Sequence, residues 1–332
     1  MCHFQDELIK PQRKDSRLME HSMTRRSFLG KLIAAMALIA GGSSVPSCYS
    51  MGGTVRDALR LVFYTDVHTR TEWDTPQAMA LAAAAINAQE PDLVIAGGDL
   101  ITDGFQSSAA KVAPRWDEYM KMHQAIQADI YPVVGNHDLV AARPSDGSPA
   151  AENPRSIYLS RLGLDRTYYS FNAVGFHFIM LDSIQITEDD YQYHGIIGPE
   201  QFEWLKQDLS NIPKATPIIL ATHMPLLTSF FIASRGATFA ARPNRVVVNN
   251  REVLELIENY NVILVLQGHL HIKEMIRWQN KTFITGGAIC GKWWRGQWYG
   301  TQEGFNVLTL AGNHVDWQYI NYGWKARRPG NK

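Results

Sequence analysis

The sequence predicts an α/β fold, because short apolar runs typical of buried strands alternate with amphipathic segments typical of helices. A second observation is that several of these runs stop at a glycine or a polar residue, as strands do at the functional edge of an open sheet. With 332 residues, of which 45% are hydrophobic, the chain can bury a large core. We therefore expect one main domain, spanning residues 55–325.

Residues 1–50 have the pattern of an export signal. Arg25 and Arg26 precede the apolar run 32–40, which is too short to span a bilayer comfortably. This arrangement resembles a twin-arginine signal, although a Sec-type signal with two chance arginines would give the same export. Cys48 closes a lipobox-like stretch and could be acylated, but a proline there is atypical. We expect an exported protein that uses the export machinery and is either periplasmic or a membrane-anchored lipoprotein.

The first half of the domain alternates strand, helix, strand, helix and strand. The predicted strands are residues 61–65, 92–96 and 130–134. One predicted helix starts at the capping residue Thr75, and a second spans residues 116–128. Polar residues that suit metal binding follow each strand: Asp66 and His68, then Asp99, then Gly135-Asn136-His137-Asp138. A spacing of two places Asp66 and His68 on the same side of an extended chain. Taken singly, each of these endings is explained equally well by a polar turn.

The second half of the domain repeats this pattern. A predicted β-hairpin over residues 168–181 suggests a second, more antiparallel sheet, and a helix begins at Gly198. Strands 217–221 and 262–266 then deliver three histidines: His223, His269 and His271. A lone histidine is more often a core or loop residue than a ligand. Five strands that all end in metal-capable residues do not fit that explanation as a set.

These motifs resemble those of the calcineurin-like metallophosphoesterase superfamily. The matching elements are Asp66-x-His68, Gly98-Asp99, Gly135-Asn136-His137-Asp138, Thr222-His223 and Gly268-His269-x-His271. They cover nearly all of the domain, and as a set they are highly specific. The resemblance implies a four-layer α-β-β-α sandwich, in which two mixed β-sheets are flanked by helices.

The resemblance also implies a centre with two metal ions. Asp66, His68 and His271 would bind the first ion, Asn136, His223 and His269 the second, and Asp99 would bridge both. Nitrogen and oxygen ligands without thiolate suit divalent or trivalent Mn, Fe, Zn or Ni. A bridging carboxylate holds such ions roughly 3.5–4 Å apart, so that a shared hydroxide can attack phosphorus in line with the leaving group. No serine or cysteine nucleophile is needed, and we find none in a nucleophile motif.

His137 resembles the family histidine that faces the substrate instead of the metals. It could protonate the leaving oxygen or stabilise charge on the phosphoryl group. Asp138 and Asp103 are both candidates for the carboxylate that orients it, so all three are predicted catalytic residues. In many relatives this carboxylate comes from the loop after the bridging aspartate. Here it stands at Asp103, one residue later than in the protein phosphatases and with no arginine beside it, which weighs against a phosphoprotein phosphatase.

The predicted substrate-binding residues are Trp293, Trp294 and Arg295, in a glycine- and tryptophan-rich stretch similar to one in secreted bacterial members of this superfamily. They could form an aromatic wall with an arginine that meets a phosphate, or they could only pack a loop over the second sheet. Residues 230–244 could form a substrate lid, although solvated arginines are the simpler interpretation. Residues 195–205 resemble a stretch of the branch that contains cyclic-nucleotide and glycerophosphodiester phosphodiesterases.

The sequence therefore predicts a secreted dimetal phosphoesterase that hydrolyses small phosphodiesters. Two alternatives remain: a phosphomonoesterase on the same site, and a surface-anchored ligand-binding protein that retains the metal site. The intact ligand set favours an enzyme over a binder. The expected partner is a small-molecule phosphoester. Nucleic-acid binding is not expected, because a formal net charge of +0 provides no basic field for a polyanion.

Overall fold

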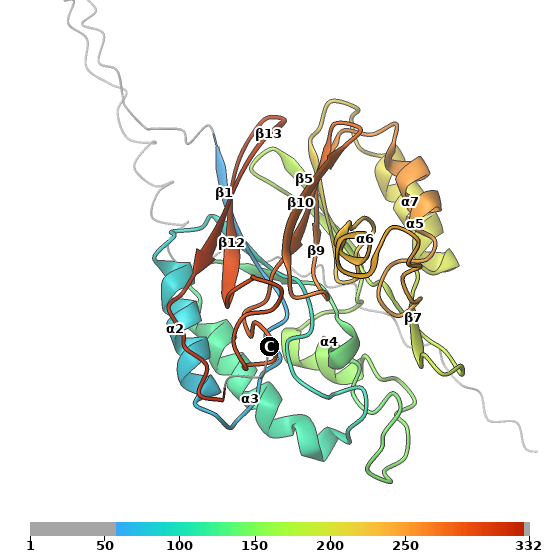
Figure 1. Ribbon diagram of the computed structural model, residues 1–332. Coiled ribbons are helices and arrows are strands. Elements are labelled where there is room, and N and C mark those ends of the chain that lie inside the picture. Colours follow the sequence, from blue (N-terminus) through green and yellow to red (C-terminus); the bar gives the residue numbers. More distant parts are fainter. Residues whose placement is uncertain (1–57, 329–332) are drawn as a thin grey trace, which may run out of the picture. The chain divides into compact units, whose positions relative to one another are not determined.

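The computed structural model describes residues 58–328, which form two large β-sheets packed face to face (Figure 1). Helices cover the outer face of each sheet, so the layers run helix, sheet, sheet, helix. This arrangement confirms the predicted four-layer sandwich. The predicted export signal, including Cys48, lies outside the described residues.

The first sheet contains the strands predicted for the first half of the domain together with two from the end of the chain. Its strands are β1 (Leu59–Tyr64), β2 (Leu93–Ala96), β3 (Ile130–Pro132), β12 (Gly304–Ala311) and β13 (His314–Asn321). Their order is β13-β12-β1-β2-β3. β1, β2 and β3 pair in parallel, whereas β12 pairs antiparallel with β1 and β13. The parallel half therefore brings the ends of β1 and β2 to the same edge.

The second sheet contains β4 (Tyr169–Ala173), β5 (Phe176–Leu181), β8 (Ile218–Thr222), β9 (Val262–Gln267), β10 (Lys273–Trp278) and β11 (Lys281–Gly286). Their order is β10-β11-β9-β8-β5-β4, and the predicted hairpin is β4 with β5. The expectation of a more antiparallel sheet is wrong, because β5, β8, β9 and β11 pair in parallel and only the two edge pairs are antiparallel. β5, β8 and β9 can pair in parallel because the connections between them contain helices that cross over the sheet.

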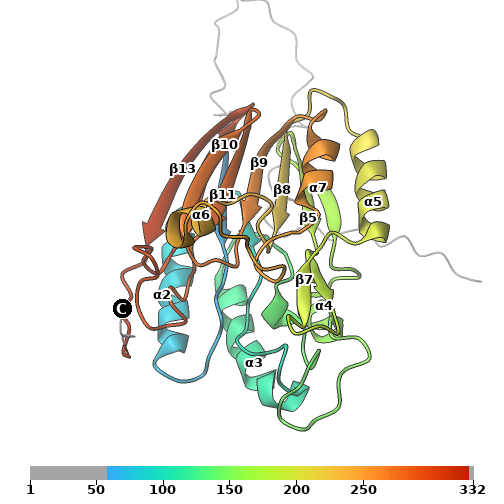
Figure 2. The same ribbon diagram turned by 45° about the vertical axis from the view of Figure 1, so that its right-hand side comes forward.

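Four helices cover the sheets. α2 (Thr75–Asn87) and α3 (Ala109–Ala125) lie on the first sheet, and α5 (Pro199–Ser210) and α7 (Asn250–Ile257) lie beside β8 and β9 of the second (Figure 2). The shorter elements are the 3-10 helix η1 (Asn136–Asp138), α4 (Ser156–Leu162), α6 (Phe230–Arg235) and the ribbon of β6 (Ile184–Ile186) with β7 (Tyr193–Gly195). Among these described helices, none is long and apolar enough to cross a membrane.

The alternation of side chains along β1 divides the core into two parts. Leu61 and Phe63 belong to the cluster between the sheets, whereas Val62 and Tyr64 belong to the cluster shared with the helices. The hydroxyl of Tyr64 lies 3.0 Å from that of Tyr119 on α3. β1 is therefore buried on both faces, which fixes the position of the loop that follows it.

Two predicted helix boundaries differ from the structure. Thr75 is not the cap of α2: Asp74 occupies that position, and the Thr75 hydroxyl donates hydrogen bonds to the carbonyl oxygens of Arg70 and Glu72. α3 begins before residue 116, and Pro114 lies inside it. Because proline lacks a backbone N–H, Pro114 predicts a break in a helix. The turns of α3 before residue 116 were therefore not predicted.

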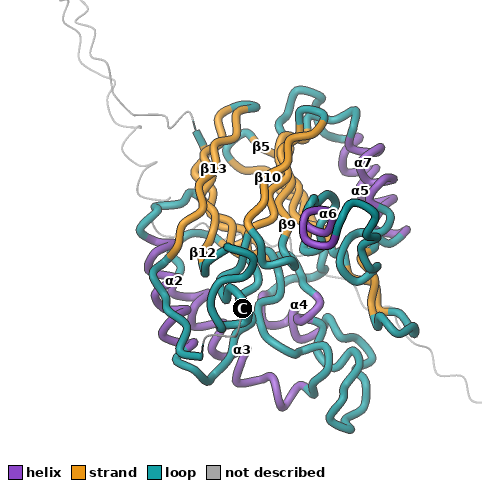
Figure 3. The backbone as a smooth tube through the Cα atoms, viewed as in Figure 1, coloured by secondary structure: helices purple, strands orange, loops and turns teal. Residues whose placement is uncertain are grey.

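The ends of β1 and β2 in the first sheet and of β8 and β9 in the second deliver the functional loops. In Figure 3 these loops gather at one end of the sandwich. Contacts between Asp99, after β2, and His223, after β8, join the two sheets there. The carboxyl ends of parallel strands commonly carry the functional site in α/β proteins.

Candidate metal centre

The seven predicted metal ligands are all buried at this end of the sandwich, each at most 7% exposed: Asp66, His68, Asp99, Asn136, His223, His269 and His271. Six of them follow β1, β2, β8 and β9, and Asn136 opens η1. The backbone N–H of His137 donates a hydrogen bond of 2.8 Å to Oδ1 of Asp99, which holds η1 against the loop after β2. Residues far apart in the sequence thus form one polar cluster.

Asp66, His68 and His271 form one half of the cluster. The Nε2 atoms of the two histidines lie 3.1 Å apart, and Oδ1 of Asp66 lies 3.2 Å from Nε2 of His271 and 3.8 Å from Nε2 of His68. The other Asp66 oxygen accepts a hydrogen bond of 2.9 Å from the backbone N–H of His269. One oxygen of Asp66 therefore fixes the loop, while the second faces the histidines.

Asp99 lies between the two halves of the cluster. Its Oδ2 atom is 3.5 Å from Nε2 of His68 and 3.2 Å from Nε2 of His223. Donor atoms of Asp99, His223 and His269 also lie within metal-binding distance of one another. Asp99 is thus placed where a carboxylate can contact ions in both halves, as the sequence predicts for a bridging ligand.

Three of the histidines are oriented by backbone carbonyl oxygens. Nδ1 of His223 lies 2.8 Å from the oxygen of Gly97, Nδ1 of His271 lies 2.6 Å from that of Gly291, and Nε2 of His269 lies 3.0 Å from that of Asn244. When the ring is neutral and this nitrogen donates its proton to the carbonyl oxygen, the opposite nitrogen has a free lone pair for a metal ion. Proteins commonly fix metal-binding imidazoles in this way.

Several buried atoms of the cluster have no hydrogen-bond partner in the described part of the chain. Four of them are Oδ1 of Asp66, Oδ1 of Asn136, Nε2 of His223 and Nδ1 of His269. A buried polar atom without a partner costs about 1–3 kcal/mol. Metal ions would satisfy all four, because nitrogen and oxygen atoms of these types are ligands of transition metals. The residues therefore fit a centre of two transition-metal ions.

Five of the seven ligands have a left-handed backbone: Asp66, His68, Asp99, His269 and His271, with φ between 45° and 69°. This conformation costs a non-glycine residue roughly 1–2 kcal/mol. Such strain persists where the surrounding structure enforces it, and it concentrates at functional sites. The sharp turns after β1, β2 and β9 thus direct the ligands into the cluster at the expense of local stability.

Two glycines of the motifs are required by close packing. A Cβ atom added to Gly135 would lie 2.2 Å from the backbone nitrogen of Asp99. Gly98 has φ +92°, and an added Cβ atom would lie 2.7 Å from Nδ1 of His223. Because any side chain at either position would displace a ligand, these glycines set the spacing of the site.

The cluster mixes neutral and charged imidazoles in the metal-free protein. Burial lowers the pKa of His68 to about 4, and burial together with the charge of His223 lowers that of His269 to about 3. Burial also lowers the pKa of His223, but the Asp99 carboxylate outweighs it and raises the value to about 9. The pKa of Asp99 falls well below its usual range, because the charges of His223 and His137 outweigh its burial.

His137 has the environment expected for a proton donor. The backbone N–H of Asp103 donates a hydrogen bond of 3.0 Å to its Nδ1 atom, so a neutral ring carries its proton on Nε2. The ring lies edge-on to that of His68, with 4.6 Å between centroids. His137 also belongs to a possible ligand group with His68 and Asp99. It therefore lies directly beside the metal ligands.

The predicted orienting role of the two carboxylates requires correction. The Asp103 side chain is 3.6 Å from Nη1 of Arg115, and only its backbone contacts His137. Arg115 is thus an arginine beside Asp103 in space, although none adjoins it in the sequence. Asp138 instead accepts backbone N–H groups of Gly135 and Leu100 at 2.9 and 2.8 Å, and its burial and the charge of Asp99 raise its pKa to about 8.

The predicted substrate-binding residues have separate roles. Trp293 is half-buried, and its ring centroid lies 4.5 Å from that of His271, so it can line the site. Trp294 is 1% exposed and donates a hydrogen bond of 2.9 Å to the backbone oxygen of His68, so it supports the loop and does not face a substrate. Arg295 is exposed and stacks over Trp73 at 5.2 Å. Of the three residues, Trp293 is the one whose ring contacts the side chain of a candidate ligand.

Sequence reasoning missed two residues at the rim. Arg245 follows Asn244, whose carbonyl oxygen orients His269, and its positive charge contributes to lowering the pKa of His269. Burial and the charge of Asp99 raise the pKa of Tyr193, and the charge of Arg245 offsets part of this increase. In the segment 230–244, which could form a substrate lid, Arg235 and Arg242 are exposed, and so is Arg245 just after it. No pattern in the sequence singles out residue 245.

Cys290 is the remaining unpredicted neighbour of the centre. Its Sγ atom lies 3.7 Å from Nδ1 of His271, the nitrogen that faces away from Asp66. Burial raises the pKa of its thiol. Cys290 also belongs to a possible ligand group with His68 and His271. Its sulfur faces Nδ1 of His271, however, whereas Asp66 and His68 face Nε2, so the thiol lies behind the ring.

Curated relatives with sequence similarity are plant phosphatases. Purple acid phosphatase 23 of Arabidopsis thaliana is 30% identical over 182 residues, which are 53% of this chain and 36% of the relative. Purple acid phosphatase 15 of the same plant is 27% identical over 206 residues, 55% of this chain and again 36% of the relative. The chain thus spans little more than a third of the length of these relatives.

Solved structures share the fold. A dimetal phosphatase from Danio rerio matches with a TM-score of 0.57 and 16% identity, covering 80% of this chain and 99% of that one. A purple acid phosphatase from yellow lupin (Lupinus luteus) seeds matches with a TM-score of 0.53 and 17% identity, covering 80% of this chain and 52% of that one. The calcineurin-like phosphoesterase family model matches residues 59–273, which include every candidate ligand. This chain therefore belongs to the calcineurin-like phosphoesterase family.

Proposed function

We propose that this chain hydrolyses small phosphate monoesters at the two-metal centre. The observation that carries the proposal is the Nε2–H of His137, which is fixed beside the candidate ligands by the backbone of Asp103. Two bound ions would activate water as the nucleophile and neutralise charge on the phosphoryl group. The purple acid phosphatases that resemble this chain support a phosphatase activity.

In this proposal the side chains of the protein have distinct tasks. Asp66, Asp99 and the four histidines hold the ions, and the carbonyl oxygens behind three of these histidines keep the rings from turning. His137 donates its Nε2 proton to the leaving oxygen, which converts a poor alkoxide leaving group into an alcohol. The Trp293 ring closes one side of the site beside His271.

Positive charge at the rim supports the proposal of a dianionic substrate over a monoanionic one. A phosphate monoester carries two negative charges at neutral pH, whereas a diester carries one. Arg245 adds a positive charge next to His269, and Tyr193 adds a hydroxyl in the same field. Positive charge beyond the metal ions stabilises the extra phosphoryl charge of a monoester.

The resemblance of residues 195–205 to the phosphodiesterase-containing branch has a structural explanation. Gly195 is enforced by packing, because an added Cβ atom would lie 2.2 Å from the backbone oxygen of Val246. The side-chain amide of Gln201 binds the backbone N–H and oxygen of Asp182 at 2.8 and 2.7 Å. Gly195 and Gln201 therefore have structural roles, and the stretch does not indicate a substrate.

Turnover of two chromogenic esters tests the proposal. Protein loaded with Mn, Fe or Zn should cleave p-nitrophenyl phosphate faster than bis(p-nitrophenyl) phosphate. An Arg245→Gln variant should lose monoester turnover through a higher KM while its slower diester turnover changes little. Faster cleavage of the diester would establish the phosphodiesterase instead. Two bound ions without turnover of either ester would favour the surface-anchored binding protein.

We further propose that the chain is exported. The arginine pair at residues 25–26 and the apolar run 32–40 support this location. Fractionation of cells that express the full chain should place the protein outside the cytoplasm, and an Arg25→Lys/Arg26→Lys variant should remain inside. Export of that variant would indicate a Sec-type signal. Incorporation of labelled fatty acid, lost in Cys48→Ser, would establish the membrane anchor.

A further inference from the structure

A row of aromatic rings leads outward from the metal centre. It begins at Trp293, whose ring centroid lies 4.5 Å from that of His271 and 6.1 Å from that of His68. Five further rings follow, each 4.8–6.0 Å from the one before it by centroid distance: Trp298, Tyr299, Phe230, Phe231 and Phe239. We call these six residues the aromatic row. It connects the side of the metal centre at His271 to the surface of the protein.

The first three rings belong to the loop after β11. The Trp298 ring meets those of Trp293 and Tyr299 edge to face, at interplanar angles of 72° and 88°. The backbones of Trp298 and Thr301 exchange two hydrogen bonds of 2.8 Å, which hold the turn between them closed. The ammonium group of Lys292 lies 5.1 Å from the centroid of the Trp298 ring, which adds a further attractive contact. The Trp298 ring therefore has a fixed place in the row.

The last three rings come from α6 and the residues that follow it. The Phe230 ring stands perpendicular to that of Tyr299, with 4.9 Å between centroids. The carboxylate of Glu274 on β10 accepts hydrogen bonds from the Thr228 hydroxyl at 2.8 Å and the Ser229 backbone N–H at 2.9 Å, just before α6. No residue of α6 is buried, so these contacts fix its position on the protein. Two segments that are distant in the sequence thus build one aromatic surface.

The aromatic row is open to solvent beyond Trp293. Tyr299 is 55% exposed and Phe239 is 40% exposed. A cavity of about 500 Å³ opens against Lys292, Trp298 and Tyr299. A contiguous exposed apolar surface commonly marks a binding site, and this cavity has the size of a small-molecule site. Because the row begins beside His271, a molecule bound along it can also reach the metal centre.

We propose that the aromatic row binds an aromatic ring in the alcohol part of the substrate while the phosphate group binds at the metal centre. This inference rests on the proposed function, because it assigns the leaving group of the same monoester. Aromatic rings pack well on other aromatic rings, edge to face or offset. A glycerol or sugar leaving group would instead lose water from its hydroxyl groups against the carbon atoms of these rings. Trp298 and Tyr299 accordingly determine specificity.

Three phosphate monoesters with the same linker test this proposal. Propyl, 3-cyclohexylpropyl and 3-phenylpropyl phosphate all release primary alcohols, so the chemical step is the same for each. We expect the kcat/KM of the metal-loaded protein to be at least about tenfold higher for the phenyl ester than for the propyl ester, chiefly through a lower KM. The cyclohexyl ester should lie between them, because it offers apolar area without an aromatic face. Equal values for the cyclohexyl and phenyl esters, or for all three, would overturn the proposal.

Binding of the corresponding phosphonates separates this inference from the proposed function. Phosphonates have a P–C bond and are not hydrolysed, so calorimetry detects the ring contact whether or not the protein is a monoesterase. 3-Phenylpropylphosphonate should bind the metal-loaded protein at least about tenfold more tightly than propylphosphonate. Equal affinities, or binding of neither compound, would refute the aromatic row as a binding surface. Failure to cleave any of the three esters, with the phenyl phosphonate still preferred, would contradict the proposed function alone.

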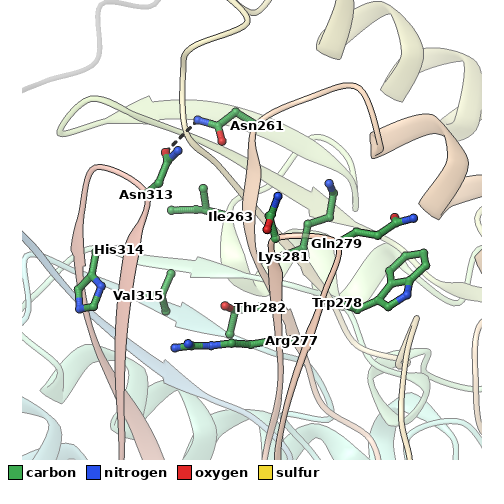
Figure 4. A pocket seen from close by; sticks show the side chains of 11 residues that line it. Asn261, Ile263, Arg277, Trp278, Gln279, Lys281, Thr282, Asn313, His314 and Val315 are labelled. Carbon is green, nitrogen blue, oxygen red and sulfur yellow. Dashed lines mark hydrogen bonds between the residues drawn. The ribbon is translucent and has the colours of Figure 1, made fainter.

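Variants locate the ring contact. Trp298→Ala should reduce the preference for the phenyl compounds to about twofold or less. Tyr299→Asn should lower it too and keeps the turn, because Tyr299 is exposed and asparagine accepts its φ of 44°. Trp278→Ala is the matched control and should keep the wild-type preference: Trp278 is 41% exposed and lines a separate cleft (Figure 4). It lies ~17 Å along β10 from Lys273, the end of the strand that follows His271. An unchanged preference in both Trp298→Ala and Tyr299→Asn, or an equal loss in Trp278→Ala, would overturn the proposal.

Discussion

The backbone N–H of Asp103 donates a hydrogen bond to Nδ1 of His137 over 3.0 Å. A backbone donor cannot lose its proton, so it fixes one tautomer of the neutral ring at every pH at which the fold persists. The proton of His137 is thereby kept on Nε2. Asp103, which the sequence suggests for its carboxylate, thus contacts His137 through its backbone N–H.

Replacement of His137 by alanine should remove the proton donor without disturbing the metals. We expect kcat for p-nitrophenyl phosphate to fall about 10²–10⁴-fold, the range for loss of general acid catalysis, while both ions remain bound. Steady-state kinetics with metal analysis checks this result. Asp103→Gly is the matched control, because glycine keeps the N–H and accepts the φ of 54°. If that variant lost as much activity as His137→Ala, the Asp103 carboxylate would be the active group.

Asp99→Asn should impair the binding of both ions, because Oδ2 of Asp99 lies between His68 and His223. The amide keeps an oxygen for the N–H of His137 but removes the negative charge. We expect less than one ion per chain after dialysis, measured by elemental analysis. Asp66→Asn is the comparison, and it should release mainly the ion held with His271. Loss of a single ion from Asp99→Asn would contradict a bridging position.

Metal binding should depend on pH through His223. Its pKa of about 9 in the metal-free protein means that a proton must leave before Nε2 binds an ion. Burial also lowers the pKa of His271, but Cys290 and Asp66 outweigh it and raise that pKa well above its usual value. Protons must therefore leave both rings, and affinity should rise by more than about tenfold per pH unit below pH 9, with proton release visible by calorimetry in buffers of different ionisation enthalpy. His68 and His269, with pKa values of about 4 and 3, should release none in this range. An affinity independent of pH between 6 and 8 would refute this role.

The same ionisation affects the stability of the metal-free protein. The pKa of His223 is raised above the ordinary value of 6.5, so its contribution is fully present below pH 6.5. That contribution is lost as the pH rises through about 9. Bound metal ions would instead stabilise the protein more as the pH rises, because they bind the neutral form of the His223 ring.

Cys290→Ser should leave both ions bound. The thiol lies behind His271, on the side of the ring that donates to Gly291, so its loss removes a packing contact and no ligand. We expect unchanged metal content and a decrease in unfolding free energy on the order of 1 kcal/mol, the usual effect of placing a hydroxyl in a buried thiol site. Metal analysis and thermal denaturation provide the two measurements. A variant with one ion would place Cys290 in the ligand set.

Six of the seven candidate ligands can be proposed from the sequence because each of them follows the end of a strand. Asp66 and His269 follow apolar runs whose burial is evident, and the pairing of parallel strands brings such ends together. What the sequence does not contain is the direction of each side chain. Trp294 illustrates this limit: its neighbour Trp293 lines the site, whereas its own indole N–H binds the backbone of His68 in the interior. Adjacent residues of one type take opposite roles because the loop backbone turns between them.

Hydrogen bonds to backbone groups account for most features of the site that the sequence does not predict. The carbonyl oxygens of Gly97, Gly291 and Asn244 orient three histidines, and any residue type offers a carbonyl oxygen. Composition and spacing therefore leave no trace of them. β12 and β13 were also not anticipated, although they complete the first sheet.

The candidate ligands are widely separated along the chain, with 203 residues between His68 and His271. Bringing such distant residues together carries a large entropic cost, which is recovered only when the sheets between them have formed. Neither half of the chain could assemble the centre early in folding, since Asp66 and Asp99 come from the first sheet and His223 and His271 follow strands of the second. Capture of the full pair of ions should accordingly be among the last events of folding, and its occurrence marks a chain whose topology is complete.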